Sequence, residues 1–250
     1  MSEDHNPMRA AQRLARPELP KRFYKKATTA PHEAGFAVLL DGRLAKTPAR
    51  RPLVVAEPGL AEALAAEWDA QQSEINPAAM PLTRIVNAAL DRVANESEAV
   101  RGEIVKYAGS DLVCYRAAGP ATLTAAQDKA WAPVLAWARQ RLGARFVLAE
   151  GVIHSAQSRD ALAAVEDALR RFDPLKLAAV STVTTLTGSA LIALALADGA
   201  LAAEAAWAAA HVDEDWQMGQ WGVDALAMER RAARFQEMCA AVLILATRQR

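Results

Sequence analysis

The sequence predicts an α+β protein, with a small amino-terminal domain of β-sheet and helices followed by a mostly α-helical carboxy-terminal domain. Three observations favour this class. β-like runs and turn signals fill the first 55 residues, alanine and leucine dominate beyond Gly119-Pro120, and 52% of the 250 residues are hydrophobic. We expect a flexible segment over residues 1–20, an α+β domain over 21–119 and a helical domain over 120–250.

Strand and turn signals come first in the chain. The apolar run Gly35–Leu40 is followed by Asp41-Gly42, a strong tight-turn signal, and by candidate return strands over residues 43–47 and 53–55. This pattern predicts a β-hairpin with a third strand, and it gives Gly42 a structural role in the turn.

Helical periodicity begins near Gly59. Leu60, Leu64 and Trp68 fall four residues apart, which predicts a buried, structural role for Trp68 on one face of a helix. Further helices are predicted at residues 82–93, 96–107, 122–142, 156–172, 175–197, 201–217 and 223–247. Short β-like stretches are predicted at residues 112–115 and 145–149.

Two helical segments carry more specific expectations. The uncharged segment from Leu177 to Ala197 has the length of about 20 residues that a membrane span needs, but serines and threonines dilute its first half. We therefore expect a buried bundle helix with a close helix contact at Gly188, and a membrane-associated scaffold remains an alternative. In the last helix, a core-facing stripe is predicted at Met228, Ala232, Phe235, Cys239 and Val242.

The charges balance overall but not locally. The chain has 29 basic and 29 acidic residues, which argues against nucleic acid as a partner. Residues 1–51 hold eleven basic and five acidic residues, whereas residues 204–229 hold six acidic residues and no Lys or Arg. Tryptophans are interleaved with these acidic residues, a composition typical of protein interfaces. The predicted protein-binding residues are Asp213, Glu214, Asp215, Trp216 and Asp224.

An alternative for the same segment is a metal-dependent enzyme. His211 and Asp215 are four residues apart on a predicted helix, a spacing that two metal ligands can use, and Asp213 lies between them. A solvated acidic helix end is the commoner explanation. Because phosphate-loop, dinucleotide and nucleophile-elbow motifs are also missing, we predict no catalytic residue, no metal, no cofactor and no bound nucleotide.

Cysteine content and the amino terminus bear on location. Cys114 and Cys239 match no metal or redox spacing, which favours reduced thiols. The first 30 residues contain acids and three prolines and lack a continuous apolar stretch, which argues against a signal peptide. We expect a soluble cytoplasmic protein without membrane insertion.

Several short motifs follow one another in a familiar order. They are Arg22-Phe-Tyr-Lys25, Leu40-Asp-Gly-Arg43 with Lys46-Thr-Pro48, Glu67-Trp-Asp-Ala-Gln71, Met80-Pro-Leu82, Asp111-Leu-Val-Cys-Tyr-Arg116 and Asp213-Glu-Asp-Trp-Gln217 with Trp221-Gly222. From about residue 21 to 247 the chain resembles the F-type ATP synthase assembly chaperones that act on the alpha subunit, found in mitochondria and alphaproteobacteria.

The resemblance implies a function and a partner. Members of such a family would bind the free alpha subunit of the catalytic head, prevent its aggregation or mispairing and promote its assembly with beta. The resemblance also implies a non-enzymatic protein without a nucleotide of its own and an α+β domain followed by a helical one. The composition is closer to the bacterial branch, which implies a cytoplasmic location, and the mitochondrial matrix is the location implied for eukaryotic relatives.

Overall fold

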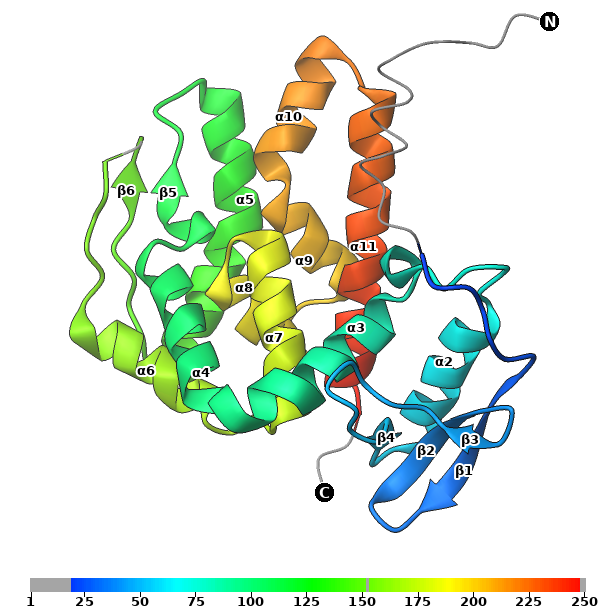
Figure 1. Ribbon diagram of the computed structural model, residues 1–250. Helices are drawn as coiled ribbons and strands as arrows, with labels where there is room; N and C mark the ends of the chain where they lie inside the picture. Colours follow the sequence, from blue (N-terminus) through cyan, green and yellow to red (C-terminus); the bar gives the residue numbers. More distant parts are fainter. Residues whose placement is uncertain (1–18, 152, 248–250) are drawn as a thin grey trace, which may run out of the picture.

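A computed structural model describes residues 19–151 and 153–247. A small antiparallel sheet with one helix against it forms the amino-terminal region, and a body of helices follows it (Figure 1). This arrangement confirms the predicted α+β class. The expected flexible segment over residues 1–20 lies almost entirely outside the described residues.

The sheet is built around the predicted hairpin. Its strands are β1 (Ala27–His32), β2 (Gly35–Leu40), β3 (Arg43–Leu44) and β4 (Val54–Val55), and β2 pairs antiparallel with each of the other three. Asp41 and Gly42 adopt φ of 48° and 76°, so they form the predicted turn. Strand β1 was not predicted, because its sequence Ala-Thr-Thr-Ala-Pro-His lacks large apolar residues.

Helix α2 (Pro58–Asp69) packs across β1 and β2 and buries Leu60 and Leu64. The prediction that Trp68 is buried on the same face is only partly correct, because this side chain is half-buried. Its indole packs against the core on one side and lines a surface cavity on the other. Its backbone oxygen accepts a hydrogen bond of 2.6 Å from the Tyr24 hydroxyl, which fixes the last turn of α2 to the segment before the sheet.

Helices make up most of the remaining chain. They are α3 (Pro81–Ala88), α4 (Ala94–Gly109), α5 (Ala121–Trp137), α6 (Arg159–Leu169), α7 (Pro174–Thr187), α8 (Ala190–Ala197), α9 (Ala203–Ala210), α10 (Val212–Trp221) and α11 (Ala225–Leu245). Wider π-helical turns at residues 89–93 and 138–142 continue α3 into α4 and extend α5. Helix α7 contacts α3, α4, α8 and α11. Helices before residue 120 therefore pack within the helical body, and the boundary near that residue stays a prediction.

The predicted helix over residues 175–197 is two helices. Gly188 has φ of 66° and ends α7, and the hydroxyl of Ser189 accepts a hydrogen bond of 3.0 Å from the Ile192 amide at the start of α8. A side chain added at Gly188 would meet no atom within 4 Å, so the predicted close helix contact is wrong and the glycine serves the left-handed cap. No helix among the described residues combines the length and the apolar character of a membrane span.

A buried carboxylate holds the start of α8. Asp111 is fully buried and accepts hydrogen bonds from the Ser189 hydroxyl at 2.5 Å, the Leu191 amide at 3.0 Å and the Val113 amide at 3.2 Å. Burial raises the pKa of Asp111 to about 6, against the lowering effect of these donors. The side chain thus joins two segments about 80 residues apart in the sequence.

The two predicted β-like stretches are mostly irregular. Residues 112–114 form a 3₁₀ turn that Asp111 caps, and only β5 (Tyr115–Arg116) is extended enough to pair. It pairs in parallel with β6 (Ala149–Glu150), which retains only the end of the predicted stretch 145–149. Side-chain capping overrides the local β-propensity of Leu112-Val-Cys here.

Candidate functional site

Helices α10 and α11 form a hairpin at one end of the helical body (Figure 1). The predicted helix over 201–217 breaks at His211, where the backbone leaves the helical region with φ of −119° and ψ of 21°. The chain then continues into α10, none of whose residues is buried. We call residues 212–234 the α10–α11 hairpin.

The end of the hairpin is shaped by Gly222 and Asp224. Gly222 has φ of 92° and terminates α10, and its amide donates to the Met218 carbonyl at 3.0 Å. The Asp224 carboxylate accepts hydrogen bonds from the amides of Leu226 at 2.9 Å and Ala227 at 3.3 Å, which caps α11. These local bonds hold the loop between the two helices in one turn.

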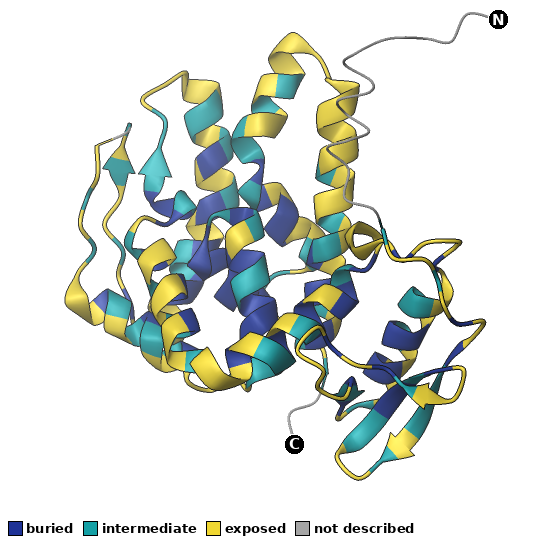
Figure 2. Ribbon diagram, in the orientation of Figure 1, coloured by how far each residue is buried: buried dark blue, intermediate teal, exposed yellow. Residues whose placement is uncertain are grey.

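Large apolar side chains are exposed around this turn. Trp221, Val223, Leu226 and Met228 have exposed fractions of 76%, 69%, 66% and 39%. We call these four residues the apolar tip. Figure 2 shows the end of the hairpin exposed, in contrast to the buried centre of the helical body. A group of large apolar side chains exposed together is typical of a protein-binding surface.

The predicted core-facing stripe of α11 is wrong over its first half. Met228 and Ala232 are exposed, Phe235 is half-buried, and Cys239 is exposed as well. Val242 is half-buried and lies in the second half of α11, where Met238, Ala240, Ala241 and Ile244 contact the core. The first half of α11 faces α10 across a cavity and not the buried centre of the helical body, so its apolar side stays accessible.

A cavity of about 480 Å³ lies between α10 and α11. Met218, Trp221 and Met228 give it apolar walls. Its charged lining residues are Glu214 from α10, Asp224 from the turn, and Arg230, Arg231 and Arg234 from α11. The acidic segment predicted from the sequence therefore faces the first arginines that follow it, and the surface is mixed in charge rather than uniformly acidic.

All five predicted binding residues have contacts within the protein, and those of the three aspartates hold the hairpin. Asp213 accepts a hydrogen bond of 2.7 Å from the amide of Gln127, a buried side chain of α5. Asp215 forms an ion pair with Arg231 of α11. Asp224 is the helix cap described above. These contacts fix the hairpin in position.

The other two predicted residues are more available to a partner. The side chain of Glu214 is 61% exposed, and its carboxylate lies 3.8 Å from the His211 ring. Trp216 is half-buried, donates from its indole nitrogen to the Thr122 hydroxyl at 3.2 Å and packs edge-on against Trp221 with ring centroids 6.0 Å apart. Trp216 thus packs against the exposed ring of Trp221 and helps to fix its position.

The metal alternative gains no support from the geometry. The ring of His211 is buried against Trp207, and its Nδ1 lies 2.8 Å from the Trp207 carbonyl oxygen. Asp213 and Asp215 face different partners, as described above. Across residues 19–151 and 153–247, no group of three or more His, Cys, Asp or Glu residues is arranged to hold a metal ion.

Known proteins match both the sequence and this structure. The family described as ATP12 chaperone protein matches residues 21–139. The crystal structure of Atp12 from Paracoccus denitrificans is 36% identical in sequence, with a TM-score of 0.81, and the match covers 90% of this chain and 97% of that one. The chain belongs to the ATP12 chaperone family. This confirms the family of F-type ATP synthase assembly chaperones that the sequence motifs indicate.

A second crystal structure agrees more closely with this ATP12 family member. The Atu1473 protein of Agrobacterium tumefaciens, a candidate chaperone, is 50% identical, with a TM-score of 0.86, over 96% of this chain and 91% of that one. The family match ends at residue 139, before the α10–α11 hairpin, whereas the structural matches extend over most of the chain.

Proposed function

We propose that this chaperone binds the free alpha subunit of the F-type ATP synthase catalytic head through its α10–α11 hairpin and holds it until it meets beta. The observation that carries the proposal is the apolar tip. Four large apolar side chains stand together in solvent on a hairpin whose remaining polar contacts serve to hold it in place.

The physical reasoning concerns what an unassembled subunit exposes. Subunit interfaces are partly apolar, and such surfaces aggregate or mispair when they are uncovered. A chaperone surface with an apolar centre and a charged rim covers them reversibly, because the apolar area supplies affinity and the charges supply selectivity. Covering a surface needs no bond to be made or broken, so we propose a non-enzymatic activity. A bacterial chaperone of this kind would act in the cytoplasm.

Capture of purified alpha subunit tests whether the apolar tip binds the client. The Trp221→Ser/Leu226→Ser variant should lose most of its capture, at least about tenfold in affinity, because two interface anchors are removed. The matched control is Leu148→Ser/Ile153→Ser, which removes two exposed apolar side chains elsewhere. Equal capture by the wild type and the hairpin variant would refute the assignment of the site.

The Glu214→Lys variant and changes in salt concentration test whether the charged rim selects the client. Because Glu214 is exposed on the rim, we expect charge reversal to lower the association rate severalfold at low salt and less at high salt. Glu98→Lys makes the same charge change on the exposed surface of α4 and should have no effect. If salt and Glu214→Lys both leave capture unchanged, the carboxylates do not select the client.

A further inference from the structure

A second surface cavity, of about 700 Å³, lies in the amino-terminal region. Its apolar lining is formed by Phe23, Tyr24, Leu40, Leu44 and Trp68. The segment before β1, strands β2 and β3, and the end of α2 contribute these side chains. We call this the amino-terminal cavity. In Figure 1, strands β2 and β3, which contribute to its lining, lie at the opposite end of the molecule from the tip of the α10–α11 hairpin.

The aromatic wall of this cavity is held in place by several contacts. The Tyr24 ring packs edge-on against Phe23 at 5.3 Å and against Trp68 at 5.8 Å between centroids. Arg22 donates hydrogen bonds to the carbonyl oxygens of Tyr24 at 3.1 Å and Asp69 at 3.0 Å, which clamps the segment to the end of α2. Phe23 nevertheless remains 74% exposed, so the wall offers a fixed apolar surface to a partner.

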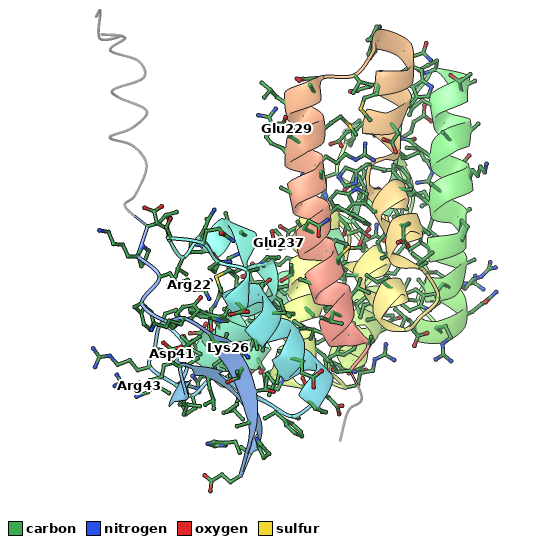
Figure 3. The ribbon with its side chains drawn as sticks, turned by 90° about the vertical axis from the view of Figure 1, so that its right-hand side faces the viewer. Arg22, Lys26, Asp41, Arg43, Glu229 and Glu237 are labelled. Carbon is green, nitrogen blue, oxygen red and sulfur yellow. The ribbon has the colours of Figure 1, made fainter. Side chains whose placement is uncertain are left out.

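The charge around the amino-terminal cavity is positive. Arg43 and Lys46 line it, and Lys26 lies on the same face (Figure 3). None of these three side chains makes an ion pair within the part of the chain that the structure describes. Their charges are therefore available to a partner.

The one carboxylate in the lining, Asp41, is already engaged. It accepts hydrogen bonds from the backbone amides of Lys25 at 2.9 Å and of Lys26 at 2.9 Å, and these bonds hold its pKa below the usual range. Its role is to fix the turn against the preceding segment. Its charge offsets one of the cations, and Arg43 and Lys46 together with Lys26 leave the net charge around the cavity positive.

We propose that the amino-terminal cavity binds an acidic segment of the client that carries an aromatic or aliphatic anchor side chain. The anchor would pack on Phe23, Tyr24 and Trp68, and the flanking carboxylates would pair with Arg43 and Lys46. The choice of the client as the source of the segment rests on the proposed function. The client would then be held at two separated places, the apolar tip and this cavity, which strengthens binding beyond either contact alone.

The test uses the full chain and a defined probe. The probe is a short fluorescein-labelled peptide in which glutamates flank two phenylalanines, and the matched probe has lysines in place of the glutamates. We expect fluorescence anisotropy to show binding of the glutamate peptide at low salt and not of the lysine peptide. Arg43→Glu/Lys46→Glu should weaken binding at least about tenfold, because it places four charge units of difference beside the peptide.

Two further variants separate the cavity from general charge and from folding. Lys129→Glu/Arg159→Glu makes the same charge change on exposed residues elsewhere and should bind the peptide as the wild type does. Phe23→Ser removes an exposed ring, should leave the unfolding midpoint unchanged and should weaken peptide binding. Absence of peptide binding to the wild type, or equal binding by all variants, would overturn the proposal.

Capture of purified alpha subunit is measured in parallel to keep the two proposals distinct. If the wild type fails to capture alpha, the proposed function fails, and the peptide titration still decides whether the cavity binds acidic segments. If alpha is captured, Arg43→Glu/Lys46→Glu should reduce capture severalfold while the hairpin stays intact. Full capture by that variant would refute the cavity as a contact for the client.

Discussion

Helices α8 and α10 have similar lengths, eight and ten residues, and opposite environments. Seven residues of α8 are buried, from Ala190 to Leu196, whereas α10 has no buried residue. Figure 2 shows the same contrast between the centre of the helical body and the hairpin. The difference indicates that stability is concentrated around α8, while the hairpin is free to contact another protein.

The two helices are also anchored in different ways. Helix α8 is surrounded by apolar side chains and capped by Ser189, with Asp111 beneath its first turn. Helix α10 is held by polar contacts at its surface, from Asp213 to Gln127 and from Trp216 to Thr122 on α5. The contact of Trp216 is exposed and that of Asp213 is half-buried. Exposed polar contacts contribute little to stability, so changes on the exposed side of α10 should alter binding more than folding.

The largest difference between the two regions should be the loss of stability when an apolar side chain is shortened. Ile192 in α8 is fully buried, so Ile192→Ala should lower the free energy of unfolding by about 3 kcal/mol. Leu226 beside α10 is 66% exposed, so Leu226→Ala should change it by less than about 0.5 kcal/mol. Urea unfolding followed by circular dichroism measures both. Similar losses would contradict the contrast.

Two aspartates extend the comparison to polar groups. Asp111→Ala should lower the free energy of unfolding by about 2–3 kcal/mol, because buried donors lose their acceptor. Asp215→Ala breaks an ion pair whose carboxylate side chain is 42% exposed, and we expect less than about 1 kcal/mol. The same urea titrations apply, and a larger loss for Asp215→Ala would show that the hairpin contributes to global stability.

Two glycines should change stability in opposite directions. Gly188→Ala puts a side chain at φ of 66° before α8 and should cost about 1 kcal/mol. Gly219 lies inside α10 with open space around it, so Gly219→Ala should stabilise the helix by up to about 1 kcal/mol. Thermal unfolding measures both shifts. Destabilisation by Gly219→Ala would mean that α10 needs that space.

The smallest expected effect concerns pH at the start of the hairpin. Burial lowers the pKa of His211 from 6.5, aided by Arg231 and Arg234 and opposed by the Trp207 carbonyl and Glu214. Since the unfolded chain then binds the proton more tightly, this contribution to stability is present above pH 6.5 and is lost as pH falls through the folded pKa.

The variant His211→Gln should remove this part of the pH dependence. The free energy of unfolding, measured by urea titration between about pH 5 and 7.5, should rise less steeply with pH in the variant than in the wild type. Asp111→Asn serves as a comparison near α8, because it removes a different titrating group. An unchanged slope in His211→Gln would contradict the buried, neutral state of this ring.

Much of the fold could be predicted from local patterns. The Asp41-Gly42 turn and the helices of the second half follow from turn chemistry and from alanine and leucine content. The break at Gly188 could not be predicted in the same way, because a glycine in a helical pattern can be a packing position or a left-handed cap. Its partner Asp111 is distant in the sequence, and only tertiary structure brings them together.

The candidate site was predictable in composition but not in form. The cluster of carboxylates and tryptophans draws attention to residues 204–229, where Trp221 is exposed, and binding of the client by these residues stays a prediction. Periodicity shows which residues share a helix face and not what covers that face, so the exposure of Met228 was missed. The neutralising arginines were missed as well, because they lie just beyond the acidic segment and fold back against it.

The most direct test of the account is hydrogen–deuterium exchange of the chaperone with and without free alpha subunit. We predict that alpha slows exchange over the α10–α11 hairpin, residues 212–234, while the amides of α8 remain slow in both states. Loss of this protection in Trp221→Ser/Leu226→Ser would link it to the apolar tip. Protection confined to other regions, with residues 212–234 exchanging as fast in the complex as in the free chaperone, would contradict the account.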